Sequence, residues 1–105
     1  MKNSILNKDF KRILYNSKSL HVRDLLFYYD IDPHPGISFI VSRRAGNAVL
    51  RNKFKRRCRA LFQQYDTAQL KNYKIIIKPK KTIKNHYSWN DLSLSFKEFC
   101  TKLRV

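Results

Sequence analysis

Acidic residues are scarce in this chain. Seven Asp and Glu residues stand against 23 Lys and Arg residues, and the formal net charge is +16 over 105 residues. Only Asp30 and Asp32 lie close together in the sequence, beside a proline-rich turn where we expect their carboxylates to bond local backbone amides. No other spacing suggests a carboxylate pair for acid–base catalysis or a two-metal site. This composition argues against a protein that cleaves a substrate with its own side chains.

Glycine, cysteine and histidine are almost as sparse. The two glycines, Gly36 and Gly46, cannot form a glycine-rich loop that cradles phosphate. The three histidines show no metal-ligand spacing with Cys58 or Cys100. Both cysteines fall on apolar helical stripes, so we expect buried, reduced thiols rather than a disulfide. The sequence therefore indicates a binding protein rather than a catalyst.

Long hydrophobic runs are also lacking. No apolar run could span a bilayer and the first residues lack a hydrophobic signal core, so we expect a cytoplasmic protein. The chain is 43% hydrophobic and 13% aromatic, which predicts one globular domain over residues 1–105. Its positive charge opposes compaction and is tolerated most readily when a polyanion neutralises it. On charge alone, an anionic membrane would be the other candidate partner.

The cations concentrate in residues 42–62, which hold eight Lys and Arg residues and no acid. From Leu50 onward, apolar residues recur at helical spacings of four, four, three and four, which predicts one buried stripe: Leu50, Phe54, Cys58, Leu61 and Tyr65. Cations stacked on the remaining surface repel one another at i, i+4. A helix that is merely soluble usually mixes acids among its bases. The pattern favours a nucleic-acid-binding helix over a solvated one.

The remaining periodicities predict helices on a small mixed sheet, in the order α-β-β-β-α-β-α. Asn7 caps a short helix that ends near residues 16–17, Asn47 caps the basic helix, and Ser88 or Asn90 caps the last helix. We expect extended segments at residues 20–22, 25–31, 37–41 and 74–78, and a loop at 80–88. The first three of these segments are predicted to form an antiparallel meander. The fold class is an α/β (α+β) two-layer sandwich.

Aromatic side chains strengthen the nucleic-acid hypothesis. A sheet that displays Tyr28, Tyr29 or Phe39 beside a basic helix could stack unpaired bases. We expect most rings to be core, however, and assign four of them to it: Phe39, Phe54, Phe96 and Phe99.

A long ordered motif, GNAV-x-RN-x-x-KR-x-x-R, lies within the basic segment. Together with Arg44, its residues resemble the signature of the bacterial ribonuclease P protein subunit: Gly46, Asn47, Ala48, Val49, Arg51, Asn52, Lys53, Lys55, Arg56 and Arg59. The resemblance covers nearly the whole chain. It extends to the helix with Asp9 and Phe10, to the strand with Tyr28, and to the strand at residues 75–77.

The resemblance implies a sandwich like that of ribosomal proteins, with a left-handed βαβ crossover that departs from the usual right-handed rule. It also implies a noncatalytic protein subunit. In that family the RNA subunit holds the catalytic Mg²⁺ ions and cuts precursor tRNA to form its mature 5′ end. The protein helps to bind the 5′ leader and assists metal binding, and its partners are the catalytic RNA and precursor tRNA. No membrane partner is expected, and no protein oligomer is required.

The resemblance also assigns residues to two sites. The leader cleft would be lined by Phe10, Ile13, Leu14, Tyr28, Ser42 and Arg44. The motif helix facing the catalytic RNA would present Arg51, Asn52, Lys53, Lys55, Arg56 and Arg59. We accordingly expect Phe10 and Tyr28 to be half-exposed.

The chain departs from the family pattern at three places. Lys53 replaces an arginine and loses its planar fork, whereas Leu14 stands where an aromatic ring is common. Arg43 and Arg44 replace a lysine pair, which preserves or strengthens phosphate contact.

Two other functions are compatible with parts of this pattern. A ribosomal or ribosome-assembly protein of the same fold would share the charge and the aromatic residues but would not need a leader cleft, and only the motif opposes it. A protein-only nuclease would need a cluster of carboxylates, which the sequence does not offer.

Overall fold

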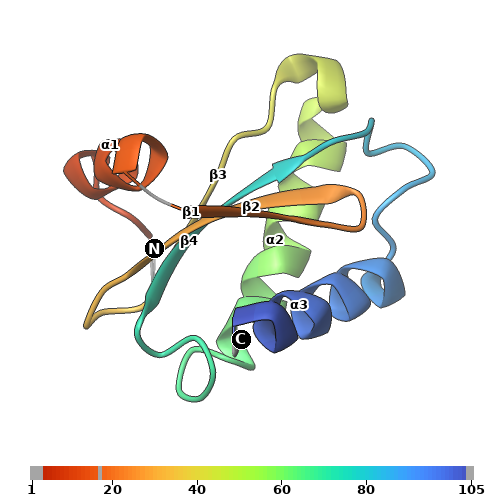
Figure 1. Cartoon of the computed structure of the whole chain (residues 1–105). Helices are drawn as coiled ribbons and strands as arrows, with labels where there is room; N and C mark the ends of the chain where they lie inside the picture. The colour runs from red at the N-terminus through yellow and green to blue at the C-terminus, as the bar shows by residue number, and fades with distance from the viewer. Residues whose placement is uncertain (1–3, 17, 104–105) are drawn as a thin grey trace.

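The computed structural model describes residues 4–16 and 18–103, in which helices pack on both faces of a four-stranded sheet (Figure 1). The elements are α1 (Asn7–Asn16), β1 (Lys18–Val22), β2 (Leu25–Ile31), β3 (Gly36–Phe39), the short 3₁₀ helix η1 (Arg43–Ala45), α2 (Ala48–Gln63), β4 (Tyr73–Pro79) and α3 (Trp89–Leu103). The predicted element order and small mixed sheet are confirmed. None of the helices in this part of the chain is both long enough and apolar enough to cross a membrane.

The strand order is β1-β2-β4-β3. β2 pairs antiparallel with β1 and with β4, whereas β3 pairs parallel with β4. The predicted antiparallel meander is therefore wrong for β3, because β4 lies between β2 and β3. Ile75, Ile76 and Ile77 of β4 are all 0% exposed, as in a strand that has neighbours on both edges and cover on both faces.

α2 and α3 cover one face of the sheet and form the main core with it (Figure 1). Alternation along β2 sends Leu25, Phe27 and Tyr29 to this face. The ring of Phe27 stacks on Phe99 at 4.2 Å between centroids and meets Phe96 edge-on at 5.7 Å. The assignment of Phe96 and Phe99 to the core is thus confirmed.

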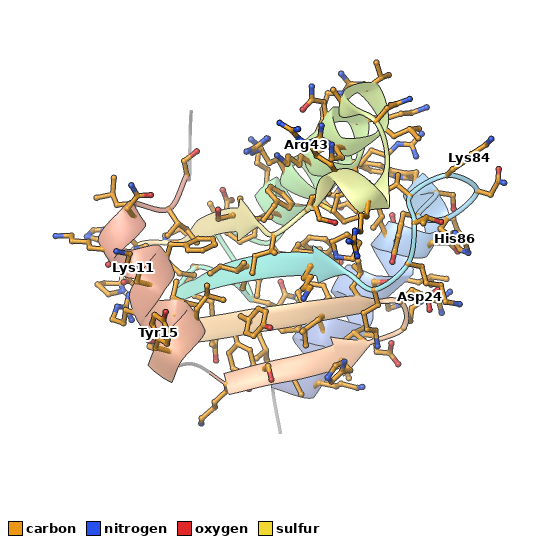
Figure 2. The ribbon with its side chains drawn as sticks, turned by 90° about the horizontal axis from the view of Figure 1, so that it is seen from above. Lys11, Tyr15, Asp24, Arg43, Lys84 and His86 are labelled. Atoms are coloured by element: carbon orange, nitrogen blue, oxygen red, sulfur yellow. The ribbon has the colours of Figure 1, made fainter. Side chains whose placement is uncertain are left out.

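The opposite face carries α1 at one end, and Figure 2 looks onto this face. Ile13 of α1 and Ile76 of β4 are each 0% exposed and lie outside the main core cluster. α1 contacts both β2 and β4. A second, smaller apolar contact therefore seats α1 on the sheet.

Side chains cap α2 and α3. Asn47 caps α2 as predicted, because its Oδ1 accepts a hydrogen bond from the Leu50 amide at 2.9 Å. Ser88 caps α3: its Oγ accepts from the Asp91 amide at 3.1 Å, while Asp91 Oδ2 accepts from the Ser88 amide at 3.3 Å. This reciprocal pair is a capping box, with aspartate in the place of the usual glutamate. A Cβ at Gly46 would lie 3.3 Å from Leu50 Cβ, so the turn before α2 suits glycine.

The cysteines behave as predicted. Cys58 on α2 and Cys100 on α3 are buried free thiols. Burial raises the pKa of Cys58 far above its ordinary value, an effect that the nearby Arg59 charge only reduces.

Tyr87 anchors the loop at residues 80–88. Its hydroxyl donates to the Asp24 carbonyl oxygen at 2.6 Å and accepts from the Lys81 amide at 2.9 Å. Arg57 Nη1 donates to the Tyr87 carbonyl oxygen at 3.3 Å. Tyr87 has a φ of 64°, an uncommon conformation for a bulky residue, which these contacts hold in place. The loop is thus tied both to the β1–β2 turn and to α2.

Candidate RNA-binding surfaces

Side chains from three strands, β2, β4 and β3, form the surface of the sheet face that α1 leaves uncovered. The register aligns Tyr28 of β2 with Ile76 of β4, which is aligned with Ser38 of β3. The next row on the same face joins Leu26 and Lys78, and Ile40 continues β3 because its amide donates to the Ile77 carbonyl oxygen at 3.0 Å. We define the open face by its half-buried or exposed residues: Leu26, Tyr28, Ser38, Ile40 and Lys78.

α1 borders one end of the open face. Phe10 and Leu14 are half-buried on it, which confirms the expectation for Phe10, and Tyr28 is half-buried as expected too. Ile13 is 0% exposed, so its assignment as a lining residue is corrected. Its side chain is used to seat α1 on the sheet and cannot contact a ligand on the surface.

Ser42 and Arg44 mark the other end. Both are exposed and line a groove of about 200 Å³ with Pro79 and Lys80. α1 contacts the sheet near Asp30, which is paired with Lys74 at the start of β4. Ser42 instead follows Phe39, which is paired with Ile77 towards the end of β4. At about 3.3 Å per residue, the stretch from Lys74 to the end of β4 spans roughly 17 Å. The predicted cleft residues other than Ile13 thus border an elongated surface, with Tyr28 between its ends.

Ion pairs fix α1 beside this surface. Arg12 of α1 pairs with Asp30 and, at 2.9 Å, with Asp32. Lys74 Nζ of β4 lies 2.8 Å from Asp32 Oδ1 and donates to the His34 carbonyl oxygen at 2.8 Å. Lys74 is only 8% exposed. One small network therefore joins α1, β4 and the turn after β2.

The two aspartates also bond local amides, as predicted. Asp30 Oδ1 accepts from the Ile31 amide and Asp32 Oδ1 from the His34 amide, each at 2.9 Å. Burial raises the pKa of Asp32, but the hydrogen bonds from Lys74 and His34 and the charges of Lys74 and Arg12 outweigh it and lower the pKa below its ordinary value. The carboxylate is thus held ionised.

A second surface lies on α2. A shallow groove of about 490 Å³, the α2 groove, is lined by Asn52, Lys55, Arg56, Arg59, Ala60 and Gln63. It brings together four of the six residues predicted for the motif helix. None of its three cations is ion-paired with an acid of the described segments.

The other two predicted motif residues lie elsewhere. Arg51 Nε donates to the Gly46 carbonyl oxygen at 3.1 Å and so supports the turn before α2. Lys53 faces a separate groove of about 260 Å³ with Leu50, Arg57 and the 80–88 loop. The six residues therefore do not share one face of the helix, because successive residues turn by about 100°.

The structure places several residues of the sheet differently from the sequence-based prediction. Phe39, expected in the core, packs against the core cluster but is itself only half-buried: its ring meets Phe54 edge-on at 6.2 Å and lies 5.1 Å from Arg59 Cζ. Tyr29 belongs to the covered face, where it meets Phe99 at 5.6 Å. Strand alternation around Phe39 points to Ser38 and Ile40 as open-face residues, a signal that becomes readable once β3 is paired with β4.

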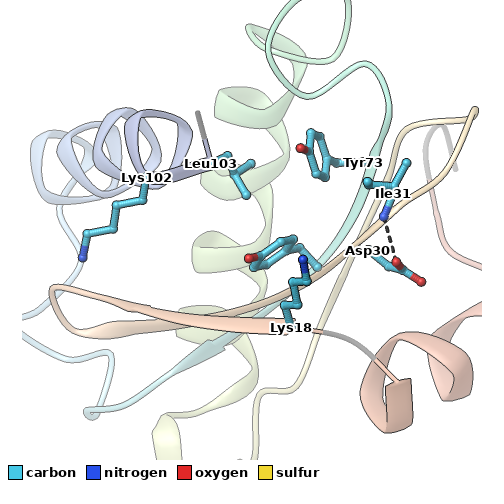
Figure 3. A pocket seen from close by; sticks show the side chains of 7 residues that line it. Lys18, Asp30, Ile31, Tyr73, Lys102 and Leu103 are labelled. Carbon is cyan, nitrogen blue, oxygen red and sulfur yellow. Dashed lines mark hydrogen bonds between the residues drawn. The ribbon is translucent and has the colours of Figure 1, made fainter. Parts of the chain in front are cut away.

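A cavity of about 380 Å³ opens at the end of β2 (Figure 3). Lys18, Tyr73 and Lys102 contribute to its lining together with Asp30, whose carboxylate accepts the Ile31 amide and pairs with Arg12 of α1. No residue of the sequence motif lines it, so we do not assign it to RNA binding.

Metal ligands do not cluster in the described segments, where no group of three or more His, Cys, Asp or Glu side chains could hold an ion. The carboxylates of Asp30 and Asp32 instead face Arg12 and Lys74.

Known proteins resemble this chain in both sequence and fold. The family model described as Ribonuclease P matches residues 4–104. The ribonuclease P protein component of Nitratiruptor is 32% identical over 74 residues, covering 70% of this chain and 68% of the relative. That of Carboxydothermus hydrogenoformans is 29% identical over 83 residues, covering 75% and 72%.

Among solved structures, the RNase P protein of Staphylococcus aureus superposes with a TM-score of 0.80 at 29% identity, over 99% of this chain and 96% of that one. The RNase P protein of Thermotoga maritima superposes with a TM-score of 0.81 over 97% of each chain, and at 20% identity it supports the fold alone. Because the family match spans nearly all of the sequence and the fold agrees, this chain belongs to the ribonuclease P protein family.

Proposed function

We propose that this chain is the noncatalytic protein subunit of ribonuclease P, which binds the catalytic RNA along α2 and the 5′ leader of precursor tRNA across the open face. The observation that carries this proposal is the separation of two surfaces with different chemistry. The α2 groove is basic, whereas the open face is aromatic and aliphatic with cations at one end. Membership of the family supports an RNA partner.

The α2 groove suits a structured RNA. Lys55, Arg56 and Arg59 have no acidic partner in the described segments, so phosphates can neutralise them. Each neutralised phosphate releases counterions, which favours binding at low salt. Arg56 and Arg59 can in addition grip phosphate with a planar fork.

The open face suits a single strand. Phe10 and Tyr28 are half-buried, so each ring is anchored yet can still offer surface to a base. A stacked base contributes about 1 to 3 kcal/mol and requires no particular sequence. Ser42 and Arg44 at the far end can hold the phosphates of the same strand.

In this proposal Mg²⁺ is held mainly by the RNA. The described side chains fit that division, because the clustered carboxylates of Asp30 and Asp32 are engaged by Arg12, Lys74 and backbone amides. The protein contributes binding and orientation. Purified protein without RNA is expected to leave precursor tRNA uncut.

Ring removal tests the proposal. The holoenzyme would be assembled with a bacterial ribonuclease P RNA, and its affinity for precursor and mature tRNA compared. Tyr28→Ala and Phe10→Ala are expected to weaken precursor binding by about 1 to 3 kcal/mol per lost stack. Affinity for the catalytic RNA and for mature tRNA, which has no leader, should change little. Tyr28→Phe keeps the ring and serves as the matched control.

Equal weakening of precursor and mature tRNA would refute the leader assignment. That result would favour a general RNA-binding protein such as a ribosome-assembly factor. Failure of the wild-type protein to restore 5′ cleavage to the RNA at low Mg²⁺ would refute the proposed function itself.

A further inference from the structure

Arg59 of the α2 groove lies over an aromatic ring. Its Cζ is 5.1 Å from the centroid of Phe39, which ends β3. The Phe39 ring is itself oriented by Phe54, a core residue that is 2% exposed and meets it at an interplanar angle of 71°. The rings of Phe54 and Phe39 thus connect the core to Arg59 in the α2 groove.

The Nε of Arg59 adds an independent observation. It is a buried donor without a hydrogen-bond partner among the described residues. Because Nε has no partner in the described part of the chain, no hydrogen bond there holds the side chain in place. An unpaired buried donor is unfavourable, so another contact must favour this position of the side chain. The ring of Phe39 supplies the alternative, because the face of an aromatic ring attracts a guanidinium and stacks on its plane.

We propose that Phe39 is a positioning residue that fixes the Arg59 guanidinium at the wall of the α2 groove, where it is preset to grip one phosphate of the RNA with paired N–H donors. The inference rests on the proposed function of α2 in binding the catalytic RNA. A guanidinium held against a ring loses little further freedom when it binds, so its fork geometry is used efficiently. Lys55, which lines the same groove, supplies charge without a fork.

A double-mutant cycle tests this coupling. The full chain would be titrated with a bacterial ribonuclease P RNA at fixed salt, as wild type, Phe39→Leu, Arg59→Lys and the double variant. Arg59→Lys keeps the charge and removes the fork. Each single change is expected to raise Kd by about 3- to 10-fold, and the double variant should be no weaker than Arg59→Lys alone, because the ring then has no guanidinium to orient.

Two further readouts separate positioning from structure. Phe39→Tyr keeps the aromatic face and should restore the wild-type Kd. Phe39→Leu should also leave the slope of log K against log salt unchanged, because no charge is lost, whereas Arg59→Ala should make it shallower by about 1.

Lys55→Ala is the matched control, since its effect should simply add to that of Phe39→Leu. Thermal melting of each variant would show that only folded proteins are compared, and Phe39→Met replaces Phe39→Leu in the cycle if the latter does not fold. Additive effects of Phe39→Leu and Arg59→Lys, or no rescue by Phe39→Tyr, would overturn the inference. Failure of the wild-type protein to bind the RNA would overturn the proposed function, and the inference with it.

Discussion

Asp32 is the acid on which the placement of α1 depends. Its carboxylate meets Arg12 at 2.9 Å and Lys74 at 2.8 Å, and it also accepts the His34 amide. Lys74 and Asp32 have side chains that are only 10% and 15% exposed. Because a nearly buried ammonium needs a counter-charge, this carboxylate stabilises β4 as well as α1.

We predict that protonation of Asp32 destabilises the domain in acid. The pKa of Asp32 is lowered in the folded state relative to its ordinary value of 3.8. Its contribution is therefore fully present above pH 3.8 and is lost as the pH falls through the lower, folded-state pKa. Urea denaturation between pH 7 and pH 2 measures this loss. In a plot of the free energy of unfolding against pH, Asp32→Asn should reduce the fall at acidic pH, which we call the acid limb. The same change should lower the free energy of unfolding by about 3 kcal/mol at pH 7, because Lys74 is left without its partner.

Asp24→Asn is the control for this experiment. Asp24 lies 3.5 Å from Lys81, but its side chain is 46% exposed, so the change should cost no more than about 1 kcal/mol and preserve the acid limb. Identical acid limbs for Asp32→Asn and wild type would show that other carboxylates dominate.

The local bonds of the aspartates were predictable from the sequence, but their ionic partners were not. Asp30 and Asp32 beside a proline turn predict contacts with nearby amides, because short carboxylate side chains reach them easily. Arg12 lies 20 residues before Asp32. Nothing in the local pattern indicates that α1 would fold back onto β2, and the burial of Ile13 was unpredictable for the same reason.

At the scale of elements, the cap of α2 offers a clean test. The Asn47 side chain accepts the Leu50 amide, one of the amides at the start of the helix without a partner inside it. We predict that Asn47→Ala lowers the free energy of unfolding by about 1 kcal/mol. Urea denaturation would measure it, with Asn47→Asp as a control that retains the cap. A loss of equal size in both variants would mean that the side chain has another role.

The charge on α2 predicts a steep salt dependence of RNA binding. If about six phosphates are neutralised, log K against log salt should have a slope of roughly −4 to −5. Titrations of the catalytic RNA across a range of potassium chloride concentrations would give this slope. Arg56→Gln should make it shallower by about 1, whereas Gln63→Ala in the same groove should leave it unchanged. A slope near zero would point to an apolar partner for α2.

The helices were easier to predict from the sequence than the pairing of the strands. The apolar stripe of α2 and the cap at Asn47 follow from residues close together in the sequence. Alternation around Phe39 predicts a strand and its two faces, but it carries no information on which strand lies beside it. The pairing of β3 with β4 involves residues 38 positions apart, such as Gly36 and Lys74. The open face could be assembled only once that pairing was known.

The whole molecule carries its charges unevenly. Described ion pairs place acids beside α1 and near the β1–β2 turn, whereas the cations of the α2 groove have no acidic partner among the described residues. With a net charge of +16, mutual repulsion of the cations opposes the folded state.

We predict that polyvalent anions stabilise the domain. An anion that binds the folded state at 100 times its Kd contributes about 2.7 kcal/mol, which should raise the melting midpoint by roughly 10 °C or more. Thermal melting in sulfate or phosphate would be compared with melting in chloride at equal ionic strength. Arg56→Gln combined with Arg59→Gln should remove much of the increase. An unchanged wild-type midpoint would show that the cations are tolerated without a ligand.

The central position of β4 also governs the order in which the protein can fold during synthesis. β4 follows β1, β2, β3 and α2 in the chain, yet it forms the ladder that joins β3 to the β1–β2 hairpin. A nascent chain that ends before Tyr73 has its basic helical segment and both strands of the β1–β2 hairpin, but it lacks the strand that joins β3 to that hairpin. Pairing across such long sequence separations is intrinsically slow compared with local helix formation. The complete sheet, and with it the core face on which α2 packs, can therefore form only after β4 has been synthesised.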